Sequence, residues 1–113
     1  MSTKLNFGRD VQGYNAYAPV QSTDRYSATL AANTVETITV PGNFENWIAV
    51  FSYAPGVEVW ISTTGTAAVP AGATFASTTS EMNPGSRQVT AATVISAISA
   101  VGGDIGVSLY ALS

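Results

Sequence analysis

Prolines recur at nearly even spacing through the middle of this 113-residue chain, where they indicate turns. They lie at Pro41, Pro55, Pro70 and Pro84, at intervals of 14, 15 and 14 residues. Glycine follows three of them directly, and Gly72 lies two positions after Pro70. Proline presets φ for the second position of a turn, and glycine accepts the positive φ that a type II turn then requires. Turn signals at such intervals are typical of an antiparallel sandwich or barrel.

Short segments rich in Val, Ile, Thr and aromatic residues lie between the turns and predict strands. We expect strands over 26–30, 34–40, 46–54, 57–62, 74–77, 87–90, 93–99 and from 105 to the end. The segment 46–54 is apolar on both faces, which places it at the centre of a sheet. Pro55-Gly56 and Gly102-Gly103 predict tight hairpins. The chain is therefore predicted to be all-β, an antiparallel β-sandwich of about eight strands with a jelly-roll-like form.

Residues 1–25 differ from the rest and predict an extended N-terminal arm, which the sandwich domain follows over 26–113. They carry nearly half of the charged residues and show no sustained alternation. Phe7, Tyr14 and Tyr17 are spaced aromatic residues that must be buried somewhere. Three alternatives stay open: the arm folds back along its own sandwich, docks on a neighbouring subunit or partner, or is disordered.

The charge content excludes some classes of partner. Charged residues make up 10% of the chain, and the net charge is −3. The four basic residues are scattered, whereas nucleic-acid binding requires clustered Lys and Arg. No apolar run approaches the length of a membrane span, and no signal peptide is visible at the N-terminus. We therefore expect no nucleic-acid or membrane partner, and synthesis in a cytoplasm.

The residue types that support most catalysis are missing. There is no cysteine and no histidine, so thiolate metal sites and the commonest general base are both absent. The carboxylates are isolated in sequence, and the serines have no histidine or lysine partner that would activate them. We expect no enzyme activity, no cofactor and no metal site.

The tryptophans are the remaining candidates for a binding role. Trp47 shares an apolar face with its neighbours and is expected in the core. Trp60 lies on the opposite side of its strand from Val59 and Ile61, so it is either an exposed anchor or a core residue. Trp47, Trp60, Tyr53 and Tyr110 could also stack on sugar rings. A glycan-binding module would have Trp60, Tyr53 or a residue of the loop 63–85 exposed over a groove.

Four segments together resemble a small family of virion structural proteins of tailed bacteriophages. They are NFGRDVQGYNAYAP (6–19), IAVFSYAPGVEVWIS (48–62), TAAVPAGATFASTTSEMNPGSRQV (66–89) and GVSLYALS (106–113). The resemblance covers nearly the whole chain, although no single motif in it is diagnostic. Such proteins are similar in role to capsid decoration, or cement, proteins: small β-sandwiches that sit on the outer surface of the shell and tie neighbouring capsomers together.

This resemblance implies a non-enzymatic protein on the capsid surface of a virion. Its expected partners are the major capsid protein of a phage and copies of itself, which form a homotrimer. The expected contacts are apolar anchors at Phe7, Tyr14 and Tyr17, polar contacts at Arg9 and Asp10, and Trp60. The alternative is a head-fibre or tail-associated module that binds host-surface glycan.

Overall fold

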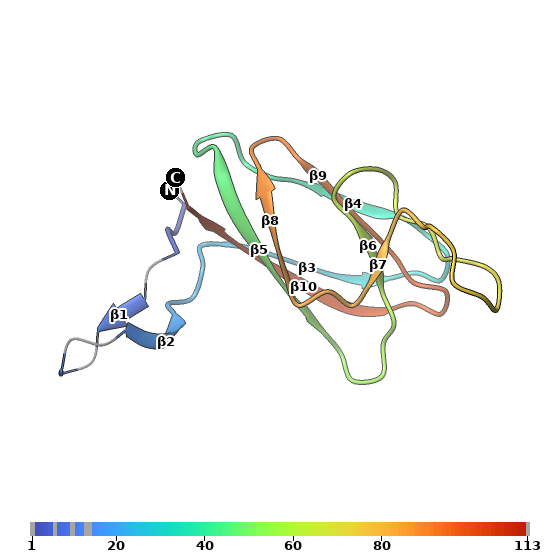
Figure 1. The fold of residues 1–113 in the computed structure, drawn as a ribbon, viewed down its shortest axis with the longest axis horizontal. Coiled ribbons are helices and arrows are strands. Elements are labelled where there is room, and N and C mark those ends of the chain that lie inside the picture. Colours follow the sequence, from blue (N-terminus) through green and yellow to red (C-terminus); the bar gives the residue numbers. More distant parts are fainter. Residues whose placement is uncertain (1, 6, 10, 13–14, 113) are drawn as a thin grey trace.

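A computed structural model describes residues 2–5, 7–9, 11–12 and 15–112 of the chain. Every regular element in these residues is a strand (Figure 1). The strands are β1 (Phe7–Arg9), β2 (Asn15–Pro19), β3 (Asp24–Leu30), β4 (Glu36–Thr39), β5 (Asn46–Tyr53), β6 (Trp60–Ser62), β7 (Glu81–Met82), β8 (Ser86–Thr90), β9 (Val94–Ile98) and β10 (Gly103–Ala111). Within the described ranges, no helix could cross a membrane.

Two four-stranded antiparallel sheets face one another, and β1 and β2 form a separate pair. The first sheet has the strand order β3-β10-β5-β8, and the second has the order β4-β9-β6-β7. The prediction of an all-β sandwich is confirmed, with eight strands in the two sheets. The prediction that segment 46–54 is central is also confirmed, because β5 lies between β10 and β8.

Successive strands of the sandwich lie in opposite sheets, apart from β6 and β7. The turn at Pro55-Gly56 forms, with Gly56 at φ 76°, but it leads from β5 in the first sheet to β6 in the second. Gly102-Gly103 likewise joins β9 to β10 across the sandwich. The predicted hairpins are therefore wrong. Each flanking strand instead finds its hydrogen-bonding partners far away in sequence, as β10 does in β3 and β5.

The segment between β6 and β7 also differs from the prediction. The strand expected over 74–77 is absent, and residues 71–79 are an exposed loop. Its small, polar side chains offer little apolar surface that a sheet could bury. Of the glycines after the four prolines, Gly56 and Gly72 take a positive φ, whereas Gly42 and Gly85 do not.

The core lies between the two sheets and takes alternate residues from each strand. In β5, Trp47 and Ala49 are fully buried and Phe51 nearly so, as the alternation predicts. The indole Nε1 of Trp47 donates a hydrogen bond to the Phe44 carbonyl at 2.9 Å. Both sheets contribute to one cluster, whose largest members besides these are Leu30, Val40, Val59, Ile61, Val89, Ile95, Ile105, Val107 and Leu109.

Candidate functional site

The N-terminal residues expected to make contacts fall on and around the β1–β2 hairpin. Phe7 and Arg9 lie on β1, and Tyr17 lies on β2. The register pairs Phe7 with Pro19 and Arg9 with Asn15, with an irregularity between them. Asp10 and Tyr14 lie outside the described residues. Residues 1–25 are thus not a single extended arm in their described part, because they include a hairpin and the start of β3.

The hairpin stands away from the sandwich at one end of the long axis (Figure 1). In the described part of the chain, β1 and β2 lie against each other and share no comparable contact with a strand of either sheet. An isolated two-stranded hairpin is marginally stable at best in water. In the described residues, the hairpin therefore has little packing on the strands of its own sandwich.

Both ends of the hairpin segment are held at the end of β10. On the N-terminal side, the Leu5 amide donates to the Ala111 carbonyl, and the Ala111 amide donates to the Thr3 carbonyl, both at 2.8 Å. On the C-terminal side, the Tyr110 hydroxyl donates to the Val20 carbonyl at 2.6 Å. The two attachment points on either side of the hairpin therefore lie at one place on the first sheet.

Trp60 lies on the outer face of the second sheet. Its neighbours in sequence, Val59 and Ile61, are buried in the core, whereas the Trp60 side chain is half-buried. Its partners across the sheet are Met82, which is 51% exposed, and Ile98, which is nearly buried. The predicted alternation is confirmed, and the role of Trp60 in an interface stays a prediction.

The loop over residues 63–80 carries the most exposed large side chain outside the hairpin. Phe75 is fully exposed, in a run that is otherwise small and uncharged. The base of the loop is fixed: the Ala67 amide donates to Ser96 Oγ at 2.7 Å, and Ser96 Oγ donates to the Gly65 carbonyl at 2.9 Å. In Figure 1 this loop lies at the end of the long axis opposite the β1–β2 hairpin.

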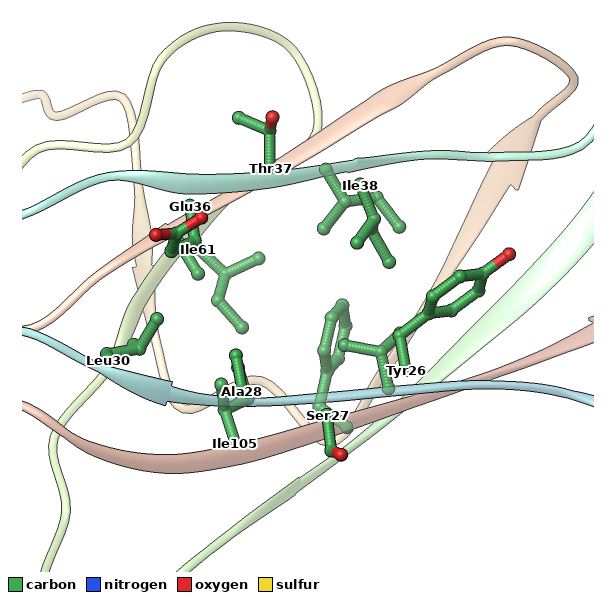
Figure 2. A pocket seen from close by; sticks show the side chains of 13 residues that line it. Tyr26, Ser27, Ala28, Leu30, Glu36, Thr37, Ile38, Ile61 and Ile105 are labelled. Carbon is green, nitrogen blue, oxygen red and sulfur yellow. The ribbon is translucent and has the colours of Figure 1, made fainter.

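A groove opens between β3 and β4, which are the edge strands of the two sheets on the same side of the sandwich. The space within it measures about 100 Å³, and it opens to solvent at its mouth. Figure 2 shows Ile38, Ile61 and Ala28 projecting into the space between the strands, while Ser27 and Thr37 point away from it. We call this space the β3–β4 groove; its lining is apolar except at its rim, and its floor comprises Phe51, Ile61, Ile95, Ala97, Ile105 and Val107.

A charged cluster joins the two sheets on the opposite side. Arg87 of β8 makes a two-point ion pair with Glu81 of β7, with Nε at 2.8 Å from Oε1. The hydrogen bond from Arg87 lowers the pKa of the Glu81 carboxyl. The Tyr53 hydroxyl donates to the Pro84 carbonyl at 2.7 Å, and burial raises the pKa of Tyr53. These groups are satisfied by one another, which indicates a structural role.

The described residues contain no group of three or more His, Cys, Asp or Glu that could hold a metal ion. Three features remain that can contact another molecule: the β1–β2 hairpin, the Phe75 loop and the β3–β4 groove. The sequence analysis missed Phe75 and the groove. One signal was available for Phe75, because it is the single aromatic residue in 63–80, a segment rich in turn formers.

Comparison of the chain with protein-family models, with curated proteins and with solved structures finds no match.

Proposed function

We propose that this chain is a non-enzymatic structural protein of a tailed-bacteriophage virion. It binds the outer surface of the capsid, on the major capsid protein, and stabilises the shell as a decoration protein. The resemblance of its segments to small virion proteins suggests this role. The β1–β2 hairpin is the observation that carries it, because in the described residues it packs little on its own sandwich, and such an element is suited to docking on another surface.

The strand order is further support. Strands alternate between two four-stranded sheets of orders β3-β10-β5-β8 and β4-β9-β6-β7. This alternation is what we expect of a jelly roll, an eight-stranded architecture that viral capsid domains use. Fold alone does not assign function, and lectin domains use the same architecture. The structural support for the decoration role therefore comes from the hairpin rather than from the fold.

The low charge of the chain also fits a protein of a repeating lattice. Charged residues are 10% of the sequence, compared with about 25% in a typical domain. Few charged groups then lose their hydration when a surface is covered. Binding at many identical sites on a shell allows each contact to be weak.

The test is removal of the hairpin alone. Residues 6–19 are replaced by a short Gly-Ser linker, which is feasible because Leu5 and Val20 are both held near Tyr110 and Ala111. Shells of the phage that encodes this chain, assembled without it, are mixed with either form and sedimented. The full chain is expected to sediment with the shells, and the hairpin-less form to stay in the supernatant.

The matched control keeps the hairpin and substitutes an exposed residue on β8 of the sandwich, Gln88→Ala, which should sediment like the full chain. Equal sedimentation of the hairpin-less form would remove the role of the hairpin, and no sedimentation of the full chain would overturn the decoration role. In that second case, retention of the full chain on a glycan array at millimolar sugar would favour the alternative, a glycan-binding module that uses Trp60 or Phe75.

A further inference from the structure

We propose that Phe75 of one copy of this chain inserts into the β3–β4 groove of a second copy. The 63–80 loop and the groove then form a head-to-tail contact between identical chains. The proposal concerns how copies of the chain join one another, and it does not depend on the capsid as a partner.

Phe75 has the properties of an inserting side chain. It is fully exposed in the single chain, in a loop whose residues 71–79 are all exposed. The whole 63–80 segment contains no charged residue, so its burial would remove no charge from water. A large apolar side chain that is exposed on a loop tip gains from burial in proportion to the apolar area covered.

The groove has the properties of a receptor for such a side chain. Isoleucines from both sheets line it, and Ile38 at its mouth is only partly buried. Ala28 on the β3 side is small and exposed, which leaves the entrance open (Figure 2). Glu36 at the rim is the single charged residue of the lining, and the uncharged loop meets it without like-charge repulsion.

The base of the 63–80 loop and the groove lie on opposite faces of the second sheet. The base of the loop is bonded to Ser96 of β9, which points to the outer face. Ile95 and Ala97, the two neighbours of Ser96, point inward and line the groove. Since side chains alternate between the faces of a strand, the loop leaves from the face that the groove does not use. The loop of the same chain is therefore not placed to fill the groove, and we assign the groove to the loop of a second copy.

Each chain has one Phe75 loop and one groove, on different surfaces, so every copy both gives and receives a side chain. Such a heterologous contact forms a ring when the rotation between neighbours closes, and a filament when it does not. A closed ring leaves no unfilled groove, and a ring of three is the homotrimer expected from the resemblance.

The first test is the solution mass, measured by light scattering over a range of concentrations. The full chain is expected to form an oligomer that Phe75→Ala dissociates, with the dissociation constant raised by about thirtyfold or more, the size of a hot-spot aromatic. The matched control is Val101→Ala, at a residue 80% exposed in the β9–β10 turn, and it should leave the mass unchanged. A full chain that is monomeric up to millimolar concentration, or an oligomer indifferent to Phe75→Ala, overturns the proposal.

The second test addresses the groove. Ala28→Trp places an aromatic ring at the entrance and should dissociate the oligomer while the thermal unfolding temperature stays the same or rises. The chain contains no cysteine, so the pair Ala28→Cys and Ala76→Cys, which keeps Phe75, can also be oxidised without interference. Covalent multimers on a non-reducing gel, beyond the dimers that Ala76→Cys alone can give, support the contact. Monomers and simple dimers alone contradict it.

Discussion

Gly102 holds a backbone conformation that other residues rarely adopt, at the turn between β9 and β10. Its φ is 83°, and a Cβ atom built on it would lie 2.5 Å from the Leu30 carbonyl oxygen. We predict that Gly102→Ala lowers the free energy of unfolding by about 2 kcal/mol or more, from positive-φ strain and the backbone clash. The measurement is denaturant unfolding. Gly42→Ala is the control: its Cβ would meet nothing within 4 Å, so stability should stay or rise slightly.

The ion pair between Glu81 and Arg87 should make the free energy of unfolding depend on pH. Arg87 lowers the pKa of Glu81 below its ordinary 4.5, so the folded state binds the proton of Glu81 less readily than the unfolded state does. The contribution of this pair is therefore fully present above pH 4.5 and is lost as the pH falls through the folded-state pKa. The effect is small, because both side chains are largely exposed to water.

The variant Arg87→Gln should return the pKa of Glu81 towards 4.5, as followed by the NMR shift of its side-chain carboxyl. The free energy of unfolding of Arg87→Gln should approach that of the unsubstituted chain as the pH falls through the folded-state pKa of Glu81. Arg25→Gln changes the net charge equally at a site on β3 and should leave the Glu81 titration in place. An identical titration of Glu81 in all three proteins would show that the ion pair does not form in solution.

At the scale of elements, buried serines fix the base of the 63–80 loop. Ser96 is 1% exposed, and its hydroxyl bonds to the Ala67 amide and the Gly65 carbonyl. We predict that Ser96→Ala costs about 1–3 kcal/mol, because two backbone groups lose their partner in a buried site. Amide hydrogen exchange at Ala67 should accelerate more than that of the core strands. Ser77→Ala, on the exposed part of the same loop, should change neither value.

The strands themselves could be predicted from alternation, whereas their assignment to sheets could not. In the segment that forms β5, Trp47, Ala49 and Phe51 share one apolar face, and burial of that face requires only that a second sheet lie opposite. Pro55-Gly56 indicates that the chain turns, but a turn of this composition serves a hairpin and a crossing between sheets alike. The choice depends on partners far away in sequence, such as β3 for β10.

The candidate contact features also divide into those that the sequence indicates and those that depend on how the sheets pack. The aromatic spacing before Val20 indicated that these side chains must be buried somewhere, although not that a hairpin forms within residues 1–25. The β3–β4 groove could not be predicted, because it depends on how far apart the edges of two sheets lie. Phe75 falls in the segment 74–77, where a strand was expected. Its exposure results from the lack of apolar neighbours in the loop.

At the scale of the whole molecule, the contact features lie at opposite ends of an elongated body. The protein measures 51 × 28 × 26 Å, with the β1–β2 hairpin at one end of the long axis and the Phe75 loop at the other (Figure 1). The two contacts should therefore be independent. The form without the hairpin is expected to form oligomers with the same number of copies as the full chain. The Phe75→Ala variant is expected still to sediment with shells through its hairpin. Loss of both properties in either variant would contradict their separation.

The last prediction distinguishes the hairpin from the chain that anchors it. Replacing residues 6–19 by a linker should lower the thermal unfolding temperature by no more than a few degrees, since β1 and β2 share little contact with the strands of the two sheets. Deleting residues 1–25 should lower the unfolding temperature much more. This deletion removes the first two residues of β3, and it also removes four groups that form hydrogen bonds to β10. The bonded groups are the Thr3 carbonyl, the Leu5 amide, the Val20 carbonyl and the Ser22 hydroxyl.

Each of these four hydrogen bonds contributes about 0.5–1.5 kcal/mol, which together corresponds to a fall of about 10 °C or more in a domain of this size. Circular dichroism melts of the full chain, the linker form and the 26–113 fragment measure the three temperatures. If the fragment melts with the full chain, residues 2–5 and 20–25 add nothing to the sandwich. If the linker form melts with the fragment, the hairpin itself supports the sandwich, and its role as a free docking element is lost.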